Sequence, residues 1–106
     1  MDAVREYLVN RRVGPHVIDG GLDYLIAAWT RVATRAEGRE ATWYAEEWLN
    51  DLDTREILQG LFDHVPESRT ALTAVKDADI RFRSAVEKNW WYWREPPTGY
   101  LSATVR

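Results

Sequence analysis

The chain has 106 residues, 45% of them hydrophobic and 29% charged, with a formal net charge of −3 at pH 7. These values are typical of one soluble globular domain that is long enough to bury a hydrophobic core. The net negative charge disfavours nonspecific binding to nucleic acid, which depends on neutralising phosphates. The absence of cysteine excludes disulfides, thiolate nucleophiles and cysteine-based metal sites, and we expect neither a cofactor nor a metal.

No segment of the sequence predicts a signal peptide or a membrane span. Residues 1–6 lack the apolar stretch that a signal peptide carries. The longest purely apolar run, residues 25–29, is far shorter than the roughly 20 residues needed to cross a bilayer. We therefore expect a cytoplasmic protein that has no membrane partner.

The N-terminal third of the chain predicts two helices. The first is expected over residues 2–12, where the apolar face consists of Val4, Tyr7 and Leu8. Gly14-Pro15 breaks it, and residues 14–21 are expected to form a loop or a tight turn. The second helix is the clearest element, because apolar residues recur at the i, i+3, i+4, i+7 spacing. They are Leu22, Leu25, Ile26, Trp29, Val32, Ala33 and Ala36.

The middle of the chain predicts two more helices. The third is expected over residues 39–50, and its inward-facing residues are Trp43, Tyr44 and Trp48. The segment that follows resembles a capping box, in which Asp53 accepts from the next turn and Glu56 reaches back. It predicts the start of a fourth helix, the apolar face of which consists of Ile57, Leu58, Leu61 and Phe62.

A fifth helix is expected to open at or near Pro66 and to end before Pro96-Pro97, since proline lacks the N–H that a helix needs. Its apolar stripe consists of Leu72, Val75, Ala78, Phe82, Ala85 and Val86. Asp79 lies beside this stripe, which predicts a partly buried pair with an arginine of the second or third helix. The pattern thus predicts an all-α, single-domain bundle of four to five short helices over residues 1–97, and residues 98–106 form a C-terminal tail.

The aromatic residues 90–93 are the most unusual feature of the chain, which holds six tryptophans in total. In a helix Trp90 and Trp93 would share a face, whereas in an extended segment Trp91 and Trp93 would do so. Neither arrangement places all four rings on one face, so some rings are expected to cap the bundle and others to lie at its rim. Because Trp, Tyr and Arg dominate protein interfaces, the candidate partner-binding residues are Trp91, Tyr92, Trp93 and Arg94.

Acidic residues gather where the third helix is expected to end. Glu47 and Asp51 are spaced i, i+4 and so share a helical face. With Asp53 and Arg55 they form a candidate polar site for a small ligand or a reaction, and the alternative is a solvated acidic face with a helix cap. Two rows of basic residues are likewise either solvated faces or contacts for an acidic partner or a phosphate backbone. They are the pair Arg31 and Arg35 and the row Arg69, Lys76 and Arg83.

The two histidines do not have the spacing to carboxylates that metal sites in helical bundles use. His64 lies at a helix end, where we expect its ring to interact with the last carbonyl groups. His16 is expected to make a hydrogen bond within the loop that follows the first helix.

Four parts of the chain form a pattern that resembles a group of small bacterial helical proteins with no assigned function. They are segments 14–22, 48–55 and 81–83 and the aromatic segment. The pattern includes Asn-Asp-x-Asp-x-Arg, Arg-Phe-Arg and Trp-Trp-Tyr-x-Arg, where Trp91 is the second tryptophan and Arg94 the arginine. The resemblance implies a compact bacterial cytoplasmic protein and implies no activity. It also groups residues 51–55 with the aromatic end as one motif.

The sequence favours a small protein-interaction module, of an antitoxin-, immunity- or adaptor-like kind, that binds another protein or a second copy of itself. The surplus of Trp and Arg supports this interpretation. No Gly-x-Ser-x-Gly elbow and no nucleotide-binding glycine fingerprint is present. The alternative is a small-ligand binder or an enzyme that uses Glu47, Asp51, Asp53 and Arg55. Nucleic acid is not the expected partner.

Overall fold

The computed structural model describes the backbone of residues 2–37 and 45–88, and the side chains of residues 2–37 and 51–85. This part of the chain is helical throughout its regular structure and contains no strand. The elements are α1 (Ala3–Asn10), α2 (Pro15–Glu37), α3 (Ala45–His64), the 3₁₀ helix η1 (Pro66–Ala71) and α4 (Leu72–Lys88). The predicted all-α, single-domain bundle is confirmed, whereas the boundary at residue 97 lies outside the described residues.

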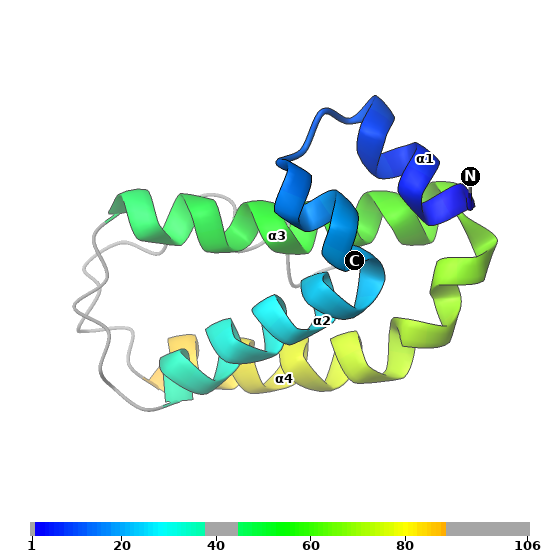
Figure 1. Cartoon of the computed structure of the whole chain (residues 1–106). Helices are drawn as coiled ribbons and strands as arrows, with labels where there is room; N and C mark the ends of the chain where they lie inside the picture. The colour runs from blue at the N-terminus through cyan, green and yellow to red at the C-terminus, as the bar shows by residue number, and fades with distance from the viewer. Residues whose placement is uncertain (1, 38–44, 89–106) are drawn as a thin grey trace.

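Helix α2 lies at the centre of the bundle and packs against α1, α3 and α4 (Figure 1). Its C-terminal half runs beside α4, and α1 lies across the end where α2 begins. The buried side chains of α2 are Leu25, Trp29, Val32, Ala33 and Ala36. They meet Leu58 and Leu61 of α3 and Val75 and Phe82 of α4 in one hydrophobic core. Within the described residues, no helix combines the length and the apolar character that crossing a membrane requires.

Helix α1 begins at Asp2, which caps it by accepting a hydrogen bond from the backbone N–H of Arg5 at 2.8 Å. The predicted inner face is confirmed, since Leu8 is buried and Val4 and Tyr7 pack against the core. The helix ends at Asn10, and Arg12 then adopts a left-handed backbone with φ 61°.

The expected loop over residues 14–21 is wrong, because α2 already begins at Pro15. Proline suits this position, since the first residue of a helix needs no N–H partner. The chain leaves helical geometry at Gly21, where φ is 62° and ψ is −148°. Only glycine adopts such angles freely, so the glycines here mark a kink in α2 rather than a loop before it.

The predicted boundary between a third and a fourth helix is also wrong, because Ala45–His64 is one helix. Asp53 lies inside it and is exposed, so it does not begin a helix. Asp and Asn have low helix propensity, but tertiary contacts override that preference. Here Leu52 turns into the core, and Asp51 and Arg55 find partners on neighbouring helices.

The fifth predicted helix begins differently from the expectation. Pro66 opens the short 3₁₀ helix η1, and the α-helix α4 starts only at Leu72. The predicted apolar stripe is confirmed over the described side chains, because Val75, Ala78, Phe82 and Ala85 are buried. The predicted helix end at residues 96–97 lies outside the described residues.

Candidate functional site

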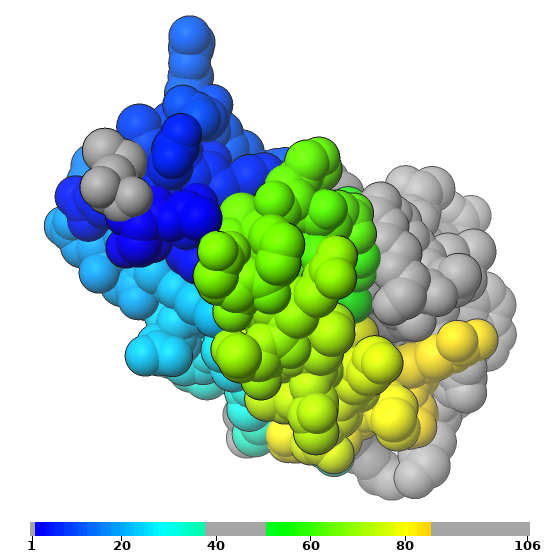
Figure 2. Space-filling model, turned by 90° about the vertical axis from the view of Figure 1, so that its right-hand side faces the viewer, coloured from blue at the N-terminus to red at the C-terminus, as the bar shows by residue number. Residues whose placement is uncertain are grey.

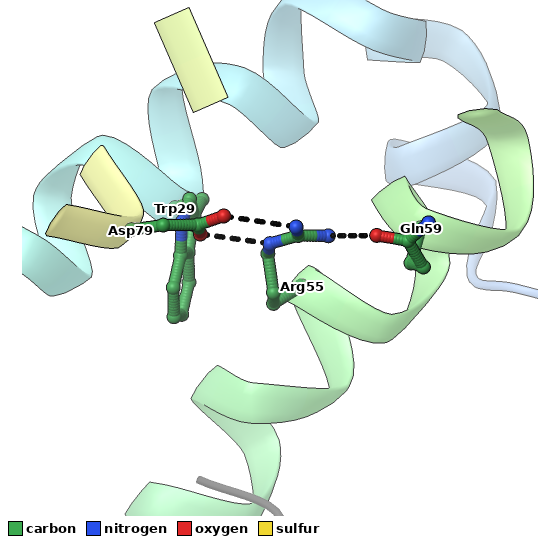
Figure 3. A network of polar contacts seen from close by, with 4 residues as sticks. All are labelled: Trp29, Arg55, Gln59 and Asp79. Atoms are coloured by element: carbon green, nitrogen blue, oxygen red, sulfur yellow. Dashed lines mark hydrogen bonds and ion pairs between the residues drawn. The ribbon is translucent and has the colours of Figure 1, made fainter. Parts of the chain in front are cut away.

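A buried ion pair joins α3 to α4. The guanidinium of Arg55, which is only 2% exposed, donates from Nε to Asp79 Oδ1 at 2.8 Å and from Nη2 to Asp79 Oδ2 at 2.9 Å (Figure 3). The indole Nε1 of Trp29 donates to the same Oδ1 at 2.8 Å. One carboxylate of α4 therefore accepts from both α2 and α3.

The polar contacts continue along α3 toward the surface. Arg55 Nη1 donates to Gln59 Oε1 at 3.1 Å, and Gln59 Nε2 donates to Asp63 Oδ1 at 2.9 Å. These residues are spaced by four positions and so share one face of the helix. Asp63 is exposed, so a continuous chain of hydrogen bonds leads from the solvent to Trp29. We call Trp29, Arg55, Gln59, Asp63 and Asp79 the polar network.

Aromatic rings enclose the inner part of the polar network. The rings of Trp29 and Phe82 lie 5.0 Å apart at an angle of 49°. The guanidinium carbon of Arg55 lies 6.0 Å from the centre of the Phe62 ring, at the outer limit of a cation–π contact. A buried charge is costly unless its hydrogen bonds are satisfied. Among the described residues, no buried side-chain nitrogen or oxygen lacks a partner.

Two more ion pairs lie around the C-terminal end of α2. Arg35 Nη2 donates to both carboxylate oxygens of Asp51, at 3.1 Å each. Arg81 Nε donates to Glu37 Oε1 at 2.9 Å, and its Nη2 donates to Thr34 Oγ1 at 3.0 Å. The hydrogen bond to Glu37 raises the pKa of Arg81 above its ordinary value. These pairs connect α2 to α3 and α4 at the surface, where each contributes little stability.

The structure brings the predicted polar residues into separate contacts. Asp51 pairs with Arg35 of α2, Arg55 pairs with Asp79 of α4, and Asp53 is exposed. Glu47 lies on α3, but its side chain is outside the described residues. Within the described part, Asp51 and Arg55 therefore each join α3 to a different neighbouring helix.

The expected pairing of Asp79 with an arginine is confirmed, although its partner comes from the segment that the sequence assigned to a fourth helix. Sequence reasoning placed Trp29 in the core and missed its hydrogen bond to Asp79. The requirement that a buried indole N–H find an acceptor is the signal that could have revealed it. Gln59 and Asp63 were missed as well, although they continue the four-residue spacing of Asp51 and Arg55.

The structure describes the two histidines but not the aromatic candidate residues. The ring Nδ1 of His64 lies 2.9 Å from the carbonyl oxygen of Gly60, as expected for a histidine in the last turn of a helix. His16 lies in α2 rather than in a loop, and its ring packs edge-on against Tyr24 at 5.6 Å. The predicted partner-binding residues Trp91, Tyr92, Trp93 and Arg94 lie outside the described residues.

Two hollows lie on the surface of α2. One, of about 280 Å³, is at the kink and includes Arg5, Gly21 and the carboxylates of Asp2, Asp19 and Asp23. Its three carboxylates disfavour an anion, and within the described part of the chain no three His, Asp or Glu residues gather as a metal-binding group. The other, of about 370 Å³, is bordered by Thr30, Arg31, Thr34 and Arg35.

The chain matches no protein-family model, and no curated protein or solved structure matches it either. Its class therefore follows from its own geometry: an all-α bundle in which a buried arginine, aspartate and tryptophan join three helices.

Proposed function

We propose that this chain is a small helical module that binds another protein, or a second copy of itself, through Trp91, Tyr92, Trp93 and Arg94. An antitoxin-, immunity- or adaptor-like role in the bacterial cytoplasm is part of the proposal. The cysteine-free sequence suits a reducing compartment.

The observation that carries the proposal is the exposure of Ile80. Its side chain is 67% exposed in the middle of α4, where the neighbouring Ala78 and Phe82 are buried. Helix α4 extends to Lys88, three positions before Trp91. The outward side of α4 thus presents an apolar residue on the same stretch of chain that supplies the aromatic segment. One exposed isoleucine is common on protein surfaces. Ile80 supports the proposal because it lies close in the sequence to the aromatic residues 91–93.

The polar contacts support a binding role over a chemical one. Two of the four residues of the alternative site, Asp51 and Arg55, already form ion pairs within the bundle. A reaction that used Arg55 would have to break a buried pair, and breaking such a pair by removing one partner costs about 3–5 kcal/mol. Interfaces, in contrast, gain most of their binding energy from a few Trp, Tyr and Arg side chains.

The proposal is tested with a photo-crosslinking amino acid placed at Tyr92 of the full chain. We expect a specific crosslinked product in the producing cells, and loss of that product in Trp91→Ala and Trp93→Ala variants that unfold at the wild-type midpoint. Sedimentation velocity of the pure chain over a range of concentrations then separates a self-associating module from one that binds a different protein.

A matched pair of variants tests the contribution of α4. Ile80→Glu should weaken the crosslink, whereas Ala27→Glu, which adds the same charge at an exposed position of α2, should leave it unchanged. If the tryptophan variants instead lower the unfolding midpoint and the chain yields no crosslinked partner, the rings belong to the core and the proposal fails.

A further inference from the structure

The first 20 residues of the chain differ from the rest in how they are held. Among residues 2–20, Leu8 is the one buried side chain in the described structure. The other buried apolar residues of the described structure belong to residues 25–85. A helix as short as α1, with 8 residues, is not stable in isolation. The segment therefore depends on contacts with the remainder of the bundle, which come from Leu8 and from partly buried residues that pack against the core. These are Val4, Tyr7, Val13, Val17 and Ile18.

These residues form a unit of their own, which we call the N-terminal hairpin (residues 2–20). It consists of α1 and the part of α2 that precedes the kink. An ion pair joins the two parts, with Arg5 Nη2 of α1 3.7 Å from Asp19 Oδ1 of α2. In Figure 1 the hairpin lies over α3, and Figure 2 shows it as a protruding end of the molecule. The unit joins the bundle through Gly21.

Tyr7 is the residue through which the hairpin contacts the last turns of α3. The Tyr7 ring stacks on His64 with centres 5.8 Å apart, and its hydroxyl lies over Gly60 where a Cβ atom would overlap it. Arg11 Nη1 donates to the Tyr7 hydroxyl at 3.2 Å. Leu8 adds the buried apolar contact. Undocking of the hairpin would therefore uncover the surface of α3 around Gly60, whereas His64 is already exposed.

The connection at Gly21 has the properties of a hinge. Its φ of 62° and ψ of −148° lie in a region that only glycine adopts freely, and no heavy atom lies within 4 Å of the position where a Cβ would stand. The hollow of about 280 Å³ beside it lies between the start of α1 and the kink. The side of Gly21 that would carry a Cβ thus faces open space.

We propose that the N-terminal hairpin opens as a separate unit about Gly21 while the rest of the bundle stays folded, and so acts as a movable cover for α3 at Gly60. Regions with few buried apolar contacts open at lower free energy than the core does. The contacts behind this proposal lie within residues 2–64, so it does not rest on the aromatic segment.

Native-state hydrogen exchange of the full chain tests this proposal. The probes in the hairpin are the backbone amides of Arg11 and Ile18, which donate to Tyr7 and Gly14. The probes in the bundle are those of the buried residues Leu58 and Val75. We expect protection factors at least about tenfold lower in the hairpin, with a weaker dependence on urea, because the hairpin opens without global unfolding.

The variant Val75→Ala makes the test decisive. It should lower protection at Leu58 and leave the hairpin unchanged, because the contacts of Val75 persist when only the hairpin opens. Tyr7→Ala should lower protection in the hairpin, and in the bundle by no more than the same free energy, because global unfolding also breaks the Tyr7 contacts. Gly21→Ala should likewise lower protection in the hairpin, because a side chain at Gly21 favours a straight α2 in which α1 no longer docks.

Either of two results would overturn the proposal. In the first, the hairpin and the bundle show equal protection and lose it together in Val75→Ala, so the hairpin opens only when the whole chain unfolds. In the second, the amides of Arg11 and Ile18 show no protection at all, so the hairpin is not docked.

Discussion

Asp79 and Arg55 are separated by 24 positions in the sequence, yet they form a two-point ion pair inside the bundle, with Trp29 as a third partner. Each carboxylate oxygen of Asp79 accepts from a different nitrogen of Arg55, which fixes the orientation of the guanidinium plane as well as its distance. This contact joins α3 to α4 directly.

Breaking the pair from one side should be costly. Asp79→Ala leaves the buried Arg55 charge and the Trp29 indole without their acceptor, and we expect a loss of about 3–5 kcal/mol in the free energy of unfolding. Urea denaturation followed by circular dichroism measures this loss. The triple variant Trp29→Phe, Arg55→Met, Asp79→Leu removes all three polar groups together, and we expect it to recover most of the stability. A triple variant less stable than Asp79→Ala would contradict this explanation.

Gly60→Ala should destabilise the chain although alanine favours helix more than glycine does. Helix propensity alone predicts a gain of about 1 kcal/mol. The new methyl group would instead overlap the Tyr7 hydroxyl. We expect this overpacking to cost about 1–3 kcal/mol, which leaves a net loss of up to about 2 kcal/mol after the gain in helix propensity. Thermal unfolding gives the sign. The double variant with Tyr7→Ala should lose less than the sum of the two single variants, since the overlap is then absent.

Arg12→Gly should stabilise the protein. Arg12 has a left-handed backbone with φ 61°, just after the end of α1. Such a backbone costs a residue with a side chain about 1–2 kcal/mol, whereas glycine adopts it without that penalty. We expect a higher unfolding midpoint in a thermal scan, by an amount that corresponds to about 0.5–1 kcal/mol because glycine also loses more entropy on folding. The exposed residue Asn10 provides the control, because Asn10→Gly replaces a residue of right-handed helical geometry and should destabilise.

The exposed ion pair between Arg35 and Asp51 should contribute far less than the buried one. Half of the Arg35 side chain is exposed, and such pairs contribute about 0.2–1 kcal/mol. Arg35→Met, which keeps most of the aliphatic length, should change the urea midpoint only slightly in low salt. The difference from wild type should shrink further in 1 M NaCl, a concentration that screens exposed charges over about 3 Å. A loss as large as that of Asp79→Ala would contradict this interpretation.

The sequence predicted the core better than it predicted the helix ends. The apolar spacing identified Leu25, Trp29, Val32 and Phe82 as inward-facing, because burial of one helical face leaves a period that is visible in the residues themselves. The helix ends were inferred from glycines and from capping residues, and both of these also occur inside helices. Gly20-Gly21 looked like a loop and forms a kink, and Asp53 looked like a cap but lies inside α3.

The polar network could be predicted only in part, for a different reason. A charged residue beside an apolar stripe, such as Asp79, indicates a buried partner but not its identity. Arg55 is selected by the way α3 packs across the bundle, and that packing depends on contacts between distant segments. The assignment of a break near Asp53 hid the continuous four-residue spacing from Asp51 to Asp63, which extends across that point.

Because of that spacing, the hydrogen bonds along α3 depend on the number of residues between their members. A single inserted residue between Arg55 and Gln59 would turn everything beyond it by about 100° around the helix axis. Gln59 would lose Arg55, and Leu61 and Phe62 would rotate away from the core. Four inserted residues would come much closer to restoring the face, because four residues make slightly more than one turn. We therefore expect this helix to tolerate changes in residue type at its exposed positions far better than changes in its length, whereas the loop between α1 and α2 is not subject to that constraint.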